Sequence, residues 1–208
     1  MPDEDPDLSP LALSILELLD ERPMHPYELA STMRERHQDE FIRLNFGSLY
    51  HTVEALERDG WIAPVEREKE GRRPERTIYG LTVAGRGLLV RVVGDILANP
   101  KREYLHFSAG LMFMHHLDSS TASGHLGHRA DALQAVIDKL TRIMAELRSE
   151  GVTRLSLIEL EHKIDLLEAE RKWVQKLRGE IADGRLEWKV GIDAVNQALR
   201  RRHGTSAH

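Results

Sequence analysis

NFGSLYHTVEALERDGWI, residues 45–62, is the stretch that decides the fold. Either Asn45 or Ser48 can cap a helix here, because short polar side chains satisfy the free amides of a first helical turn. Leu49, Val53 and Leu56 then recur at the spacing of one helical face, which predicts that they face inward. A glycine and a short apolar run follow, so the helix should end at residue 60 and a strand should begin.

The outer face of this helix changes from small and polar residues at its start to acidic residues further along. The first two turns carry small and polar residues, namely Asn45, Gly47, Ser48, Tyr50, His51 and Thr52. Such residues suit a helix that enters the major groove of DNA by its N-terminal end. Acidic side chains at Glu54, Glu57 and Asp59 would repel phosphate further along. An ordinary surface helix is the alternative, with Tyr50 packing on the preceding helix.

Two helices are expected before this stretch and a hairpin after it. Ser9 can cap a helix over residues 9–21, and Pro26 can open a second that fades after residue 33. Residues 61–65 and 77–81 have the composition of two short strands, and Thr82 can cap a fourth helix that ends near residue 99. The order helix, helix, helix, hairpin predicts a winged helix-turn-helix.

The hairpin turn, residues 67–76, holds five positive charges against three negative ones. In a wing these cations would contact phosphate or a narrow minor groove, although a charged turn is also typical of a solvated loop. With the helix, they give the predicted DNA contacts: Arg43, Asn45, Gly47, Ser48, Tyr50, His51, Lys69, Arg72, Arg73 and Arg76.

The second half of the chain predicts two long antiparallel helices joined near Gly151. The first apolar stripe is Leu126, Leu133, Val136, Leu140, Ile143 and Leu147. We expect a partner subunit to cover the exposed apolar surface of the pair. The predicted dimerisation residues are Leu157, Leu160, Ile164, Leu167, Trp173, Val174 and Leu177.

Four segments together resemble the PadR family of transcriptional regulators: SPLALSILELL (residues 9–19), HPYELA (25–30), the stretch at 45–62, and GRRPERTIYGLT (71–82). Residues 160–177 are similar to the helical C-terminal domain of its longer members. The resemblance implies a homodimer built by helix exchange, bound to a pseudo-palindromic operator, usually as a repressor. It also implies, in some members, a response to phenolic acids or hydrophobic drugs.

Composition narrows the class of protein. The chain has no cysteine, which excludes disulfides and thiolate sites and fits a reducing cytoplasm. No apolar run approaches the roughly 20 residues that span a bilayer, so we expect no membrane partner. The net charge of -5 is concentrated in residues 1–40, which hold three Lys/Arg against eleven Asp/Glu, while residues 41–91 hold nine against seven. The middle segment is therefore the expected nucleic-acid surface, and the expected location is cytoplasmic, at the nucleoid.

Eleven histidines raise the alternative of a metal site. His125 and His128 share a helical face, but the adjacent His115 and His116 should diverge, and no HExxH pattern is present. We therefore expect no metal, no cofactor and no enzymatic activity.

An apolar segment at residues 107–117 suits a core helix or a pliable effector pocket. The pocket residues would be Phe107, Met112, Phe113 and Trp173, and its ligand a small hydrophobic molecule. Sequence cannot separate this from simple core packing.

The fold class expected is mainly α, with an N-terminal winged helix-turn-helix and a C-terminal antiparallel long-helix dimerisation domain. The expected divisions are an acidic tail (1–7), a DNA-binding domain (8–99), a helical dimerisation and effector domain (100–186) and a partly helical tail (187–208). The function expected is DNA-binding transcriptional regulation. The alternatives are a winged-helix adaptor for proteins, favoured by the acidic start and by Pro74 and Glu75 in the wing, and a histidine-metal sensor.

Overall fold

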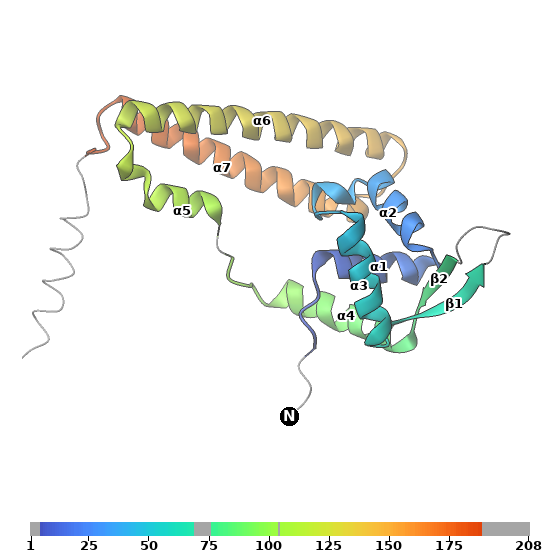
Figure 1. Ribbon diagram of the computed structural model, residues 1–208. Coiled ribbons are helices and arrows are strands. Elements are labelled where there is room, and N and C mark those ends of the chain that lie inside the picture. The colour runs from blue at the N-terminus through green and yellow to red at the C-terminus, as the bar shows by residue number, and fades with distance from the viewer. Residues whose placement is uncertain (1–4, 69–75, 104, 189–208) are drawn as a thin grey trace, which may run out of the picture. The chain divides into compact units, whose positions relative to one another are not determined.

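The structure is a computed structural model that describes residues 5–68, 76–103 and 105–188, with the backbone alone at 67, 68 and 76. The chain forms two compact units, Met1–Arg102 and Glu103–His208. Helices dominate both units, and within the described residues strands pair in one two-stranded sheet (Figure 1).

Three capped helices begin the first unit. Helix α1 (Pro10–Glu21) starts at Ser9, whose hydroxyl accepts from the Ala12 amide at 3.2 Å. Helix α2 (Pro26–Glu35) is capped by the His25 ring, and a short 3₁₀ turn, η1 (Gln38–Glu40), follows. Helix α3 (Phe46–Arg58) uses Asn45, whose Oδ1 accepts from the Ser48 amide at 2.8 Å. Of the two caps that the sequence allowed, Asn45 is therefore the one used.

A hairpin completes the winged helix. Strands β1 (Ile62–Glu68) and β2 (Arg76–Leu81) pair antiparallel with an irregularity between Pro64 and Glu66. The loop between α1 and α2 adds one further bridge, in which Met24 and Tyr79 exchange two backbone hydrogen bonds of 3.0 Å. This bridge joins the hairpin to the helices.

Helix α4 (Val83–Ala98) closes the first unit. Thr82 caps it by accepting from the Gly85 amide at 3.0 Å. A Cβ at Gly85 would lie 2.0 Å from the Trp61 carbonyl oxygen, so this close approach of α4 to the start of β1 requires glycine. The core beneath is formed by α1, α2, α3 and Ile62, and its largest fully buried side chains include Ile15, Leu16, Leu18, Met24, Leu29, Met33, Leu49 and Val53.

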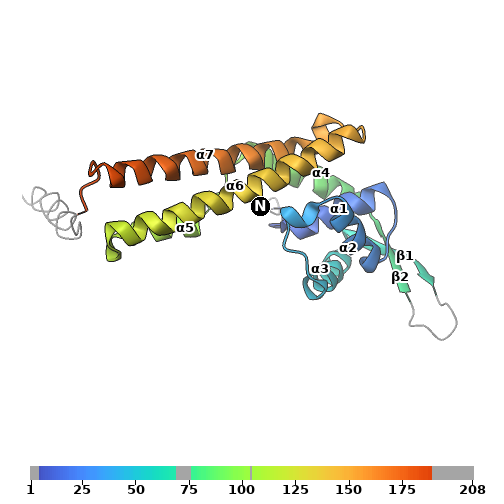
Figure 2. The ribbon, with the colours of Figure 1, turned by 90° about the horizontal axis from the view of Figure 1, so that it is seen from above.

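The second unit contains α5 (His106–Met112), η2 (Met114–His116), α6 (Ser119–Ser149), η3 (Arg154–Leu157) and α7 (Ile158–Ala182). Helices α6 and α7 lie side by side in both views (Figures 1 and 2). Gly151, at φ 89°, turns the chain between them. The predicted fold class, mainly α with a wing and a long C-terminal helix pair, is confirmed.

The register of α6 differs from the sequence prediction at one position. Val136 was expected in the seam but is 38% exposed, and Ile137 is buried in its place. Helix α6 also begins at Ser119, capped by Asp118, well before the predicted stripe. Since both residues of the 136–137 pair are β-branched aliphatics, the heptad pattern could not choose between them.

The ends of the chain are described in part. Asp5 pairs with Arg91 and Asp7 with Lys101, so the acidic segment from residue 5 onward contacts basic side chains of its own unit. At the other end the Trp188 indole donates to the Leu117 carbonyl oxygen at 2.8 Å. The tail helix predicted beyond this point falls at residues 189–208, outside the described residues. Within the described chain, no helix is both long and apolar enough to cross a bilayer.

Candidate nucleic-acid interface

The N-terminal end of α3 presents an exposed surface of small and polar residues. Leu49, Val53 and Leu56 are buried, as predicted for the inner face. Asn45, Gly47, Ser48, Tyr50 and His51 are all exposed, so the structure brings five predicted contact residues together on one surface. Tyr50 is 43% exposed, so its ring is not buried against α2.

Gly47 lies in the first turn of α3 with nothing filling the space beside it. A Cβ there would meet Asn45 Oδ1 at 3.6 Å, which is an ordinary contact, and its φ is not positive. Glycine costs a helix about 0.5–1 kcal/mol relative to alanine. The fold of this chain therefore does not explain the glycine, whereas close approach of an external group would.

Two arginines at this end of α3 form no ion pair within the described part of the chain. Arg43 is exposed and precedes the cap residue Asn45 by two positions. Arg34, on α2, lies with its guanidinium carbon 5.2 Å from the centre of the Phe46 ring. By contrast, carboxylates pair with Arg22, Arg36, Arg58, Arg86, Arg91 and Lys101. In the described part of the first unit, the two arginines without a carboxylate partner therefore both lie beside the N-terminus of α3.

An aromatic pair accompanies these arginines. Tyr27, near the start of α2, stacks on Phe46, the first residue of α3, with ring centres 6.0 Å apart and planes 13° apart. Both rings are exposed, Tyr27 by 65% and Phe46 by 42%. The sequence did not single out Tyr27, Arg34 or Phe46. Tyr27 and Arg34, seven residues apart, lie on one face of α2, and only the packing of α2 on α3 brings them to Phe46.

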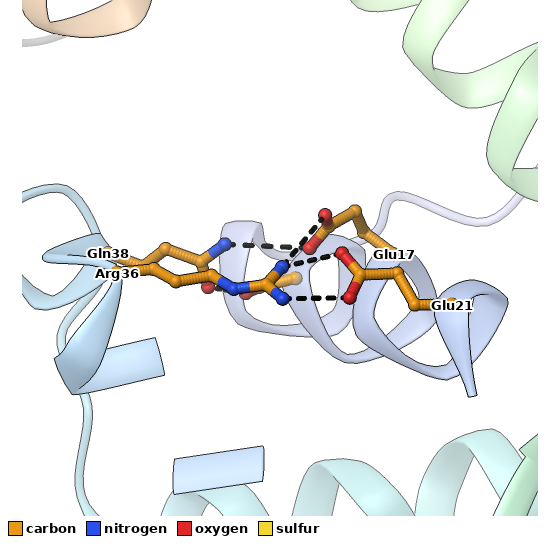
Figure 3. Close-up of polar contacts among 5 residues, drawn as sticks. Glu17, Glu21, Arg36 and Gln38 are labelled. Carbon is orange, nitrogen blue, oxygen red and sulfur yellow. Dashed lines mark hydrogen bonds and ion pairs between the residues drawn. The ribbon is translucent and has the colours of Figure 1, made fainter. Parts of the chain in front are cut away.

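A polar network fixes the segment that leads from α2 to α3 (Figure 3). Arg36 donates two hydrogen bonds to Glu21 of α1, from Nη1 at 2.5 Å and from Nη2 at 2.8 Å. Gln38 donates to Glu17 at 3.5 Å and accepts from the Ser14 hydroxyl. These contacts hold residues 36–38 against α1, and so help to set where α3 begins.

The two acids of the network have opposite pKa shifts. Burial raises the pKa of Glu17 above its ordinary value of 4.5, and the neighbouring Glu21 carboxylate raises it further. The hydrogen bonds from Arg36 lower the pKa of Glu21. The single guanidinium therefore holds Glu21 ionised and leaves Glu17 only partly compensated.

The predicted wing contacts fall mostly outside the described residues. Lys69, Arg72 and Arg73 lie in the segment 69–75, which the structure does not describe. Arg76 is the first residue of β2, with its backbone alone described. Their role as DNA contacts stays a prediction.

Comparison with known proteins identifies this winged helix. Residues 15–91 match the Transcriptional regulator PadR-like family. This part of the chain is a PadR-like domain. It contains α1 from Ile15, α2, α3, the hairpin and most of α4, so the family assignment rests on the elements that build the interface described above. No curated protein sequence matches the chain.

Solved structures share the fold over both units. Bacillus subtilis PadR in complex with operator DNA is 18% identical, with a TM-score of 0.69 over 82% of this chain and 98% of that one. The Vibrio cholerae virulence activator AphA is 18% identical, with a TM-score of 0.64 over 83% and 98%. The PadR-like regulator BC1756 from Bacillus cereus is 20% identical, with a TM-score of 0.60 over 84% and 99%. At these identities the likeness concerns the fold.

The predicted dimerisation residues divide into two groups. Leu157, Leu160, Ile164 and Val174 are buried within this single chain, and Leu167 and Leu177 are half-buried. Trp173 is 45% exposed. Most of this set therefore packs inside the second unit, and Trp173 is the member with free surface.

The predicted effector residues come together only in part. Phe107 and Trp173 meet edge to face with ring centres 6.1 Å apart, and the Arg129 guanidinium carbon lies 3.7 Å from the Phe107 centre. Met112 and Phe113 are exposed and stand outside the buried cluster that Phe107 joins. Arg129, which the sequence did not single out, also pairs with Glu170 at 2.5 Å.

The histidines differ from expectation in one respect. His115 and His116 were expected to diverge, but their ring centres lie 4.4 Å apart, in the 3₁₀ turn η2. His125 and His128 are exposed on α6. Among the described residues no group of three His, Asp or Glu side chains has the arrangement of a metal site.

Proposed function

We propose that this chain is a DNA-binding transcriptional regulator that reads its operator with the N-terminal end of α3. The observation that carries the proposal is the position of Arg34 and Arg43, two arginines without a carboxylate partner in the described chain, beside an exposed polar helix end. Basic side chains next to a groove-sized helix supply the phosphate contacts that dominate affinity. The PadR-like domain and the fold shared with an operator-bound protein support the same conclusion.

The test is the salt dependence of the protein's binding to the DNA upstream of its own gene. Each phosphate that the protein neutralises adds about 0.9 to the steepness of log affinity against log salt. We expect Arg43→Ala to flatten the slope by about that amount. Arg58→Ala is the matched control, because Arg58 lies at the opposite, C-terminal end of α3 and pairs with Asp59 at 3.0 Å. Equal slopes for the two variants would contradict the proposed interface, and a flat slope for the parent would favour the protein adaptor.

The regulator is proposed to act as a homodimer, and α7 supports this. Its inner face packs on α6 through Leu160, Ile164 and Val174. Ile158 and Leu166 are 52% and 58% exposed and, with Trp173, follow a spacing that places them on the opposite face. A helix that is apolar on two opposite faces needs two partners, and a second copy supplies the second. Its two reading helices would then meet half-sites about 34 Å apart, or a multiple of that.

Repression with release by a small hydrophobic effector completes the proposal. A planar molecule would bind at the Phe107 and Trp173 rings, and one relative by fold, Bacillus subtilis PadR, is known in complex with p-coumaric acid. Titration of the intrinsic tryptophan fluorescence with p-coumaric acid tests this, with Trp173→Phe as the control that removes the tryptophan at the proposed site and leaves Trp61 and Trp188. An unchanged parent signal would argue against this effector. A protein with this role acts in the cytoplasm at the nucleoid.

A further inference from the structure

Phe46 is the one exposed large apolar side chain in the first turn of α3, beside Gly47 and Ser48. Its ring is 42% exposed, so the core of the unit accounts for only part of its surface. A single exposed apolar residue is common in proteins and needs no special explanation. The position does need one, because the proposed function brings this turn against base edges, where polar side chains would serve hydrogen bonding.

Neighbouring side chains hold the Phe46 ring in place. The Tyr27 ring stacks on it at 6.0 Å, and the Arg34 guanidinium carbon lies 5.2 Å from its centre. Offset stacking and cation–π contacts both favour a defined ring orientation. Tyr27 and Arg34 come from α2, so the ring contacts side chains of the neighbouring helix on part of its surface.

The chemistry of the major groove then limits what an apolar ring can recognise. Base edges there present hydrogen-bond donors and acceptors, and the apolar group among them is the C5-methyl of thymine. We propose that Phe46 contacts a thymine methyl group and so sets the base preference at one position of each half-site. This inference rests on the proposed function and deepens it. Arg34, against the same ring, and Arg43 would lie near the flanking phosphates.

Deoxyuridine provides the test because it lacks only that methyl group. The full-length protein first selects its preferred duplex from a random pool, and each thymine of one half-site is then replaced singly by deoxyuridine. For the parent we expect one position at which affinity falls roughly fourfold, as for the removal of one buried methyl-sized group. For Phe46→Ala the same replacement should have no effect, whereas Phe46→Leu should keep part of it.

Arg43→Ala is the control, because it should weaken binding to both duplexes equally and leave their affinity ratio unchanged. Effects of deoxyuridine on DNA shape persist in every variant and so cancel in the comparison. The inference is overturned if no thymine position changes the affinity of the parent. It is also overturned if Phe46→Ala keeps the parent's ratio of affinities for the thymine and deoxyuridine duplexes, as it would if the surface around Phe46 bound a protein partner. Failure of the parent to select any sequence is a separate result, which refutes the proposed function itself.

Discussion

Gly47→Ala should stabilise the first unit and at the same time weaken its binding to DNA. The methyl group enters open space, since its nearest neighbour would be Asn45 Oδ1 at 3.6 Å, and the backbone is already helical. Removing a glycine from the helix should therefore stabilise the fold by about 0.5–1 kcal/mol. In a unit of this size, thermal unfolding followed by circular dichroism should show a midpoint about 2–8 °C higher.

The same methyl group should weaken DNA binding. If the first turn of α3 approaches a phosphate by its backbone, an added Cβ displaces one charge-assisted hydrogen bond, worth about 1.5–3 kcal/mol. That corresponds to a decrease of roughly 10- to 150-fold in affinity, measured by fluorescence anisotropy on the selected duplex. Gly124→Ala is the control, because Gly124 lies in α6 with open space around its Cβ position.

Two outcomes would refute this reasoning. A variant at Gly47 that binds as tightly as the parent would show that the backbone of this turn does not approach DNA. A variant that unfolds more easily than the parent would show that the position is sterically restricted within the chain. The prediction requires the two measurements to move in opposite directions, which a merely damaged protein would not do.

Three further predictions concern other parts of the chain. Gly85→Ala should destabilise the first unit by about 3 kcal/mol or more in urea unfolding, because its Cβ would overlap the Trp61 carbonyl; a small effect would contradict this. Glu17→Gln should raise the unfolding midpoint at pH 7, because a raised pKa means that ionised Glu17 is disfavoured in the fold. The gain in midpoint should shrink as the pH falls below the raised pKa towards 4.5, since the parent's Glu17 is then protonated. An equal gain at pH 4 would argue against this prediction. Leu166→Glu should give monomers in analytical ultracentrifugation, whereas Gln175→Glu should not, and an unchanged mass for both would place the dimer contact elsewhere.

The sequence predicts the structure correctly where a local signal decides it. Ser9 and Thr82 cap the helices that they were expected to cap, because a hydroxyl before an apolar-periodic segment has few other roles. The bridge between Met24 and Tyr79 was not foreseen, since a single pair of residues has no periodicity. The early start of α6 was missed because its first turn is built of small polar residues, which are weak helix formers.

The candidate site was predictable along α3 but not across helices. The polar end of α3 could be located from its own sequence, because one helix presents one periodic pattern. Arg34 and Tyr27 could not, since they reach this surface from α2 through packing that no spacing in the sequence records. Nor does a sequence show which arginines already have a carboxylate partner, and that distinction singles out Arg34 and Arg43.

The pairing of many acids with nearby basic side chains also resolves the apparent conflict between a net charge of -5 and DNA binding. Charges interact appreciably only within about 8–10 Å at physiological salt, so the local balance matters more than the total. Many acids of the acidic N-terminal segment are compensated at short range, for example Asp5 by Arg91 and Glu21 by Arg36. At the C-terminal end of α3 the Tyr79 hydroxyl donates to Glu57 at 3.1 Å. A phosphate that approaches α3 therefore meets the acidic side chains of Glu54, Glu57 and Asp59 at one end, and two arginines without a carboxylate partner in the described chain at the other. This asymmetry favours entry by the N-terminal end.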